Sequence, residues 1–192
     1  PTPSSQWQLR LGTGQPGHSL VTGQGLVTGY PLQSFRCEAV GRLAGLLFVQ
    51  HLLQYHNLQS PGTLKTFLDN KGVILTESKF KEHGIIFPAL AGTGDSDVLL
   101  ALRRIHRTIP IKIITNHVKG HQDKHSRLQD LPWPAQLNVK ADALATESLE
   151  QAEHNDDTPA HAIEDGLIQL YHEHIPVTSQ YAPILRSAVA ET

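Results

Sequence analysis

Hydrophobic residues alternate with polar ones at the start of the chain, which is the pattern of a strand with one buried face. Trp7, Leu9 and Leu11 carry this alternation, and it resumes after a glycine-rich stretch in two short apolar segments near 20–21 and 26–27. Glycine and proline between the segments favour turns rather than helix. The first thirty residues therefore predict antiparallel strands of a β-meander.

The hydrophobic spacing then changes to that of a helix between residues 34 and about 55, with Ser34 as a plausible N-cap. A strand over 64–68 follows and stops at Asp69 and Asn70, and residues 76–83 form a weakly helical segment. An aspartate at the carboxyl end of a strand in an open α/β sheet lies where such folds bind ligands. The pattern thus places one acidic residue at a favourable position.

The second half of the chain alternates helix and strand. A helix through Leu99, Leu102 and Ile105, capped within 95–97, precedes a strand at 111–114, and a further helix covers 135 to about 152. On that last helix Asn138 and Asp142 are four residues apart and share a face. Strands separated by helices pair in parallel, whereas the glycine-rich start favours antiparallel strands. We therefore expect an α/β fold with a mixed sheet and helices on both faces.

Composition sets the domain organisation and the broad class. The chain has 192 residues and a formal net charge of -2. Its single cysteine, Cys37, cannot form an internal disulfide, so we expect a reduced intracellular setting, nucleus or cytoplasm. No apolar run is long enough to span a membrane. We predict a domain over 1–152, an acidic linker over 153–162, and a tail or the start of a following region over 163–192. Because the chain lacks methionine, we expect it to be cut from something longer.

Four motifs stand in a fixed order along this pattern. They are Ser-Phe-Arg-Cys-Glu-Ala at 34–39 with Gly41, Leu-Asp-Asn at 68–70, Val-Lys-Gly-His at 118–121, and Asn138 followed by Ala141, Asp142, Leu144 and Ala145. Together, over about residues 7 to 150, they resemble the ribonuclease H family. The glycine-rich strands before Ser-Phe-Arg-x-Glu-Ala most resemble the ribonuclease H-like regions of retroelement polyproteins, which implies an upstream reverse-transcriptase region as a partner.

The resemblance implies a five-stranded mixed sheet and a two-metal nuclease that hydrolyses the RNA strand of RNA–DNA hybrids. Two Mg²⁺ or Mn²⁺ ions would be the cofactors, because hard divalent cations prefer carboxylate oxygens. By resemblance the metal ligands are Glu38, Asp69 and Asp142, and His121 would assist proton movement or product departure. Substrate contacts would come from Arg36, Asn70, Lys119 and Asn138, with Arg42 and Lys71 also near phosphates.

Two features depart from the family pattern. No Asp or Glu precedes Glu38, so the family's first strand and its aspartate are missing, and we expect them to lie upstream of Pro1. The chain as given is therefore expected to cleave poorly. His121 and Asp142 are also 21 positions apart, which leaves an insert over 122–136 that the family does not need.

Two other interpretations remain open at this point. His117, His121 and His125 have the i, i+4, i+8 spacing that would bind zinc if they shared a helix. Alternatively the domain is a catalytically inactive module that binds nucleic acid or a protein partner. In that case Glu38 is a helix-dipole partner, Asp69 a turn residue and Asp142 a solvated helix acid.

Overall fold

The elements follow one another in a mixed α/β order, as the sequence predicts. The structure is a computed structural model that describes residues 4–9, 21–27, 29, 31–58, 62–83, 94–155, 170–172 and 175–190. Residues 84–93 and most of the predicted linker lie outside these residues. The described elements are β1 (Ser4–Leu9), β2 (Val21–Leu26), α1 (Ser34–Tyr55), β3 (Thr63–Leu68), α2 (Lys71–His83), α4 (Ser96–Thr108), β4 (Lys112–His117), the 3₁₀ turns η1 (Gln122–Lys124) and η2 (Leu128–Asp130), α5 (Trp133–Asn155), β5 (Leu170–His172), β6 (Ile175–Val177) and α6 (Tyr181–Ala190).

The strands of the first 150 residues form two separate pairs within the described part of the chain. β1 and β2 pair antiparallel, and β3 and β4 pair parallel with Leu68 opposite His117. The amide of Val118 continues the parallel ladder by donating to the Leu68 carbonyl at 2.9 Å. Antiparallel and parallel strands are thus both present as predicted, but as two pairs rather than one continuous sheet.

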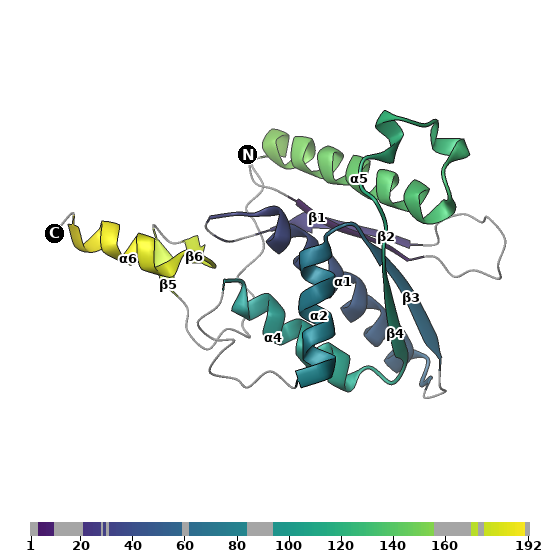
Figure 1. The fold of residues 1–192 in the computed structure, drawn as a ribbon, viewed down its shortest axis with the longest axis horizontal. Coiled ribbons are helices and arrows are strands. Elements are labelled where there is room, and N and C mark those ends of the chain that lie inside the picture. The colour runs from purple at the N-terminus through teal and green to yellow at the C-terminus, as the bar shows by residue number, and fades with distance from the viewer. Residues whose placement is uncertain are drawn as a thin grey trace.

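Helices cover both faces of the strands. Leu68 packs into a cluster with α1, α2 and α4, whereas its neighbour Phe67 packs with Val118, Leu131 and Ala135 at the start of α5. Alternate residues of a strand face opposite sides, so β3 separates the two clusters. Figure 1 shows α5 across β1 and β2, with α1, α2 and α4 gathered on the other side. Asp69 is two residues after Phe67 and is therefore expected on the same side of the strand, the side that faces α5.

Helix starts differ slightly from the sequence prediction. α1 begins at Ser34 with Gln33 as its N-cap, so Ser34 is the first helical residue rather than the cap. α2 begins at Lys71, five residues earlier than predicted, because the Asn70 side chain accepts hydrogen bonds from the amides of Gly72 at 2.9 Å and Val73 at 3.3 Å. Such a cap satisfies donors that the first turn of a helix leaves free.

A buried polar network ties the helical layer to β4. Arg42 of α1 donates to both carboxylate oxygens of Glu77 on α2, at 2.8 and 3.2 Å, and to the Thr115 hydroxyl at 2.9 Å. His106 of α4 lies 3.5 Å from the same carboxylate. Arg42 and Glu77 are both almost fully buried, so their charges compensate each other inside the core.

Among the described C-terminal residues, those around 177–179 contact the start of α4. The Asp95 amide, just before α4, donates to the Thr178 carbonyl at 2.6 Å, and Val177, Thr178 and Ser179 are buried. Gly29 has a φ of +142°, and a Cβ there would lie 2.7 Å from the Thr178 hydroxyl, so only glycine fits. α5 also continues to Asn155, past the predicted start of the linker. None of the helices in the described ranges is long and apolar enough to cross a membrane.

Candidate functional site

Three separate elements bring Glu38, Asp69 and Asp142 together. Glu38 is in the second turn of α1, Asp69 follows β3, and Asp142 is on α5. Asn138, one turn before Asp142, donates from Nδ2 to the Asp69 Oδ2 at 3.3 Å. Asp69 lies close enough to Glu38 to raise the pKa of its carboxyl group. Residues that are far apart in the sequence therefore meet at the end of β3.

The electrostatics of this group are those of carboxylates held close together. Burial, followed by the charges of Asp69 and Asp142, raises the pKa of Glu38 to about 7. Burial and the charge of Asp69 also raise the pKa of Asp142, against the opposing effect of His121. A bound divalent cation would remove this mutual repulsion. The donor set is also the one that Mg²⁺ and Mn²⁺ prefer.

Gly120 packs closely against the Asp69 carboxylate. A Cβ at position 120 would lie 2.8 Å from Asp69 Oδ2, closer than a side-chain atom normally approaches. The loop after β4 can therefore pass against the carboxylate only as glycine. A side chain at position 120 would force the Asp69 carboxylate to move, so the glycine helps to fix its position.

The structure places His121 beside Asp142 in spite of the long insert. His121 Nδ1 lies 3.7 Å from Asp142 Oδ2, and its side chain is 68% exposed. Its φ of +51° turns the chain directly into η1. The insert forms the two 3₁₀ turns η1 and η2. It does not separate His121 from Asp142, the neighbour expected from the resemblance.

Two predicted substrate contacts are not supported. Arg36 is 1% exposed, and its guanidinium donates to both carboxylate oxygens of Asp97, at 2.7 and 2.9 Å, and to Asp95 at 3.2 Å. Arg42 is likewise buried against Glu77. Neither arginine can reach a phosphate, because both are committed to ion pairs in the core. Arg36 instead fixes the first turn of α1 against the start of α4.

The other predicted contacts differ in their placement. Asn138 lies in the site, and the Lys119 side chain is exposed on the loop beside Gly120. Asn70 is next to Asp69, but its carbonyl oxygen caps α2. Lys71 is exposed at the start of that helix. Asn138, Lys119 and Lys71 are therefore the predicted contacts that the structure leaves available to a substrate.

The three histidines of the zinc interpretation do not share a helix. His117 ends β4 and its Nε2 is 3.2 Å from the Asp69 carbonyl, while His121 and His125 flank η1. Within the ranges that the structure describes, no three His, Cys, Asp or Glu side chains enclose a metal position as they stand. The three carboxylates therefore form a partial donor set that fits divalent cations in its chemistry.

Sequence reasoning considered His117 only as a zinc ligand and gave Asp123 no role, yet both are neighbours of the carboxylates. His117 contacts the backbone of Asp69, and the charge of Asp123 in η1 contributes to the raised pKa of Asp142. The parallel register could have indicated His117, since it lies directly opposite Leu68. Nothing in the sequence shows that η1 turns Asp123 back toward α5.

Comparison with known proteins adds no relative. No protein-family model, curated protein or solved structure matches the chain.

Proposed function

We propose that this chain is a ribonuclease H-like domain and that its site serves metal-dependent hydrolysis of the RNA strand of RNA–DNA hybrids. The observation that carries the proposal is the meeting of Glu38, Asp69 and Asp142, with Asn138 bonded to Asp69 and His121 beside Asp142. A helix-dipole partner, a turn residue and a solvated helix acid would each account for one of the three acids. They do not explain why three acids and an amide from three elements gather at one strand end.

The residues fit the roles that such a reaction needs. Glu38, Asp69 and Asp142 would hold the divalent cations, and Asn138 keeps the Asp69 carboxylate oriented through its 3.3 Å hydrogen bond. Two bound Mg²⁺ ions, about 4 Å apart, would supply an activated water and stabilise the leaving oxygen. The exposed His121, beside Asp142, is placed to accept and release protons at the rim of the site.

The arrangement of elements also supports the proposal. An antiparallel pair, a helix carrying the glutamate, a parallel pair and a closing helix follow in the order that the resemblance implies. Because β1–β2 and β3–β4 are separate pairs, the central strand of that family's sheet has no counterpart among the described residues. We propose that this strand and its aspartate belong to the preceding segment of a retroelement polyprotein. The 192-residue chain alone would then cleave weakly.

Cation binding tests the site independently of cleavage. We expect the 192-residue chain to bind Mn²⁺ saturably at pH 7.5, as measured by calorimetry, and Asp69→Asn to weaken binding at least tenfold because it removes a charged ligand. Asp130→Asn is the matched control, since Asp130 is exposed in η2. Equal Mn²⁺ affinity in the wild type, Asp69→Asn and Asp130→Asn proteins would contradict the proposed site.

A second candidate function is nucleic-acid binding without cleavage. It is favoured by the partial donor set, because only three carboxylates gather where the family uses four. Such a module would bind hybrids through the same surface. The two functions differ in whether a protein that includes the preceding segment hydrolyses RNA.

A further inference from the structure

Arg127, just before η2, and Lys140, on α5, lack the carboxylate partners that the buried arginines have. Arg36 and Arg42 are each held in ion pairs. In contrast, the side chains of Arg127 and Lys140 make no hydrogen bond or ion pair with any residue in the described part of the chain. Unpaired cations at a protein surface attract anions.

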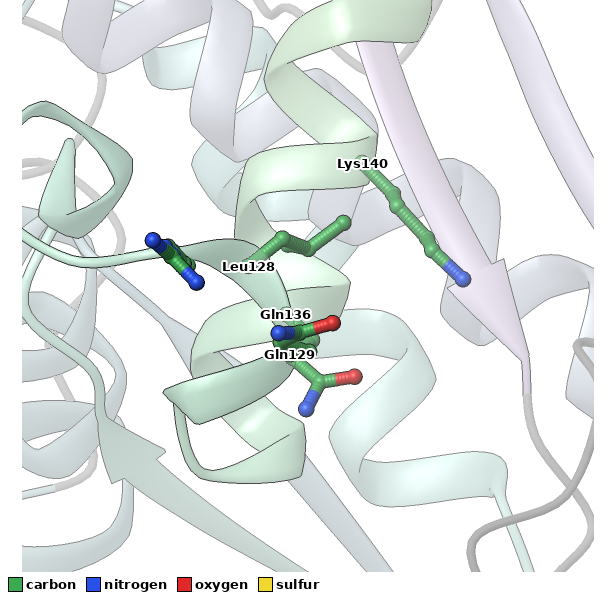
Figure 2. Close-up of a pocket in the computed structure, with 5 residues that line it drawn as sticks. Leu128, Gln129, Gln136 and Lys140 are labelled. Atoms are coloured by element: carbon green, nitrogen blue, oxygen red, sulfur yellow. The ribbon is translucent and has the colours of Figure 1, made fainter.

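These two cations line a pocket of about 380 Å³ with Leu128, Gln129 and Gln136. We call it the Arg127–Lys140 pocket. Figure 2 shows Gln129 and Gln136 close together, with Lys140 extending from the next turn of α5. Gln136 Nε2 donates to the Leu131 carbonyl at 2.7 Å, which holds the end of the insert against the helix. The walls thus combine positive charge, amide groups and one apolar side chain.

The surrounding segment is basic in an otherwise acidic chain. Residues 119–140 contain four Lys or Arg and two Asp, a net charge of +2, whereas the whole chain carries -2. Lys119 and Lys124 lie on the stretch that leads from the carboxylate site to the insert. A local basic surface of this kind is the usual electrostatic feature of a phosphate-binding face.

We propose that the Arg127–Lys140 pocket binds the phosphodiester backbone of a nucleic acid, separately from the carboxylate site. Arg127 would pair with phosphate oxygens through its planar guanidinium, and Lys140 would add a second positive charge. Leu128 and the two glutamines would contact sugar and base without reading sequence. The inference rests on the proposed function for the identity of the ligand.

The geometry of α5 makes the pocket an anchoring site. Lys140 is two residues from both Asn138 and Asp142, which is about 160–200° around the helix axis. The face of α5 that carries Asn138 and Asp142 meets Asp69, and the face with Gln136 and Lys140 is turned away from it. The proposed role of the pocket is therefore to anchor the nucleic acid, with an effect on binding rather than on bond cleavage.

Salt dependence of binding gives the test. We expect the 192-residue chain to bind a fluorescent RNA–DNA hybrid in EDTA, and Arg127→Ala with Lys140→Ala to weaken binding at least tenfold. The slope of log K against log salt should fall in magnitude by about 2, since each lost phosphate contact removes about 0.9. Both positions are at the surface, so the melting temperature should stay within a few degrees of wild type.

A matched double variant removes the same charge elsewhere. Arg107 and Lys112 are exposed at the end of α4 and the start of β4, about 20 Å along the strand from the carboxylate site. Arg107→Ala with Lys112→Ala should leave the salt slope unchanged. Equal slopes for the two double variants, or no hybrid binding by the wild type, would overturn the pocket assignment. Mn²⁺ binding that still depends on Asp69 would show that the proposed function survives this failure.

Discussion

The Glu38 carboxyl is unfavourable to the folded protein when it is ionised and no cation is bound. Its pKa is raised to about 7 by burial and by the charges of Asp69 and Asp142. The folded state therefore binds more protons than the unfolded state between about pH 4.5 and 7. Across that window stability must fall as the pH rises. Such a cost is typical of groups arranged for binding or catalysis rather than for stability.

A substitution at Glu38 measures this cost. We expect Glu38→Gln to remove most of the loss of unfolding free energy between pH 4.5 and 7.5, roughly 1–3 kcal/mol. Denaturant titrations at several pH values would detect it, with Glu150→Gln on the exposed side of α5 as control. Millimolar Mg²⁺ should stabilise the wild type at pH 7.5 more than the variant. Superimposable pH profiles for wild type and Glu38→Gln would refute the electrostatic coupling.

Single residues were predictable where a local motif defines them. Glu38, Asp69, Asn138 and Asp142 follow from motifs within a few positions of each acid, and the structure brings them together. Arg36 shows the limit, because its partners Asp95 and Asp97 are about sixty positions away. An arginine beside a predicted site residue looks like a phosphate contact until the fold reveals which carboxylates bind it.

At the scale of elements, the helical layer depends on the buried ion pair between α1 and α2. The sequence predicts α1 and α5 from their apolar spacing, but it places the start of α2 too late, because the Asn70 cap has no periodic signature. Arg42, Glu77, His106 and Thr115 come from four different elements, and no local pattern links them. Their burial nevertheless makes them decisive for packing.

Low pH should destabilise the packing of α1, α2 and α4, because it protonates Glu77. Burial opposes its ionisation, but the His106 ring 3.5 Å away and the hydrogen bonds and charge of Arg42 lower its pKa to about 2. A lowered pKa gives stability that is complete above about pH 4.5 and is lost as the pH falls toward 2, roughly 3 kcal/mol in all. Glu77→Gln should therefore cost several kcal/mol at pH 7 and little near pH 2, by urea denaturation.

A second substitution, at Arg42, tests whether the stability comes from the charge interaction with Glu77 or from packing alone. Removing Glu77 leaves the Arg42 charge buried, so adding Arg42→Met should recover part of the loss. A Glu77→Gln protein that is equally destabilised at pH 2 and pH 7 would contradict this account.

For the whole molecule, the class of fold was predictable but the separation of its strands into two pairs was not. Alternation and helical spacing report whether a segment has a buried face, but not which strand lies beside it. The docking of Thr178 and Ser179 near α4 was equally hidden, since it depends on Gly29 leaving room for the Thr178 side chain. Both features follow from tertiary packing between distant segments.

The proposed function rests on Glu38, Asp69 and Asp142 as three of the four carboxylates of a ribonuclease H-like site. Under that proposal, a protein extended to include the proposed upstream strand and its aspartate should cleave the RNA strand of a labelled RNA–DNA hybrid in Mg²⁺. Asp69→Asn in that protein should abolish cleavage and leave hybrid binding intact, because the ligand is lost while the surface remains. Cleavage that persists in Asp69→Asn, or an extended protein that binds hybrids without cleaving them, would contradict the account.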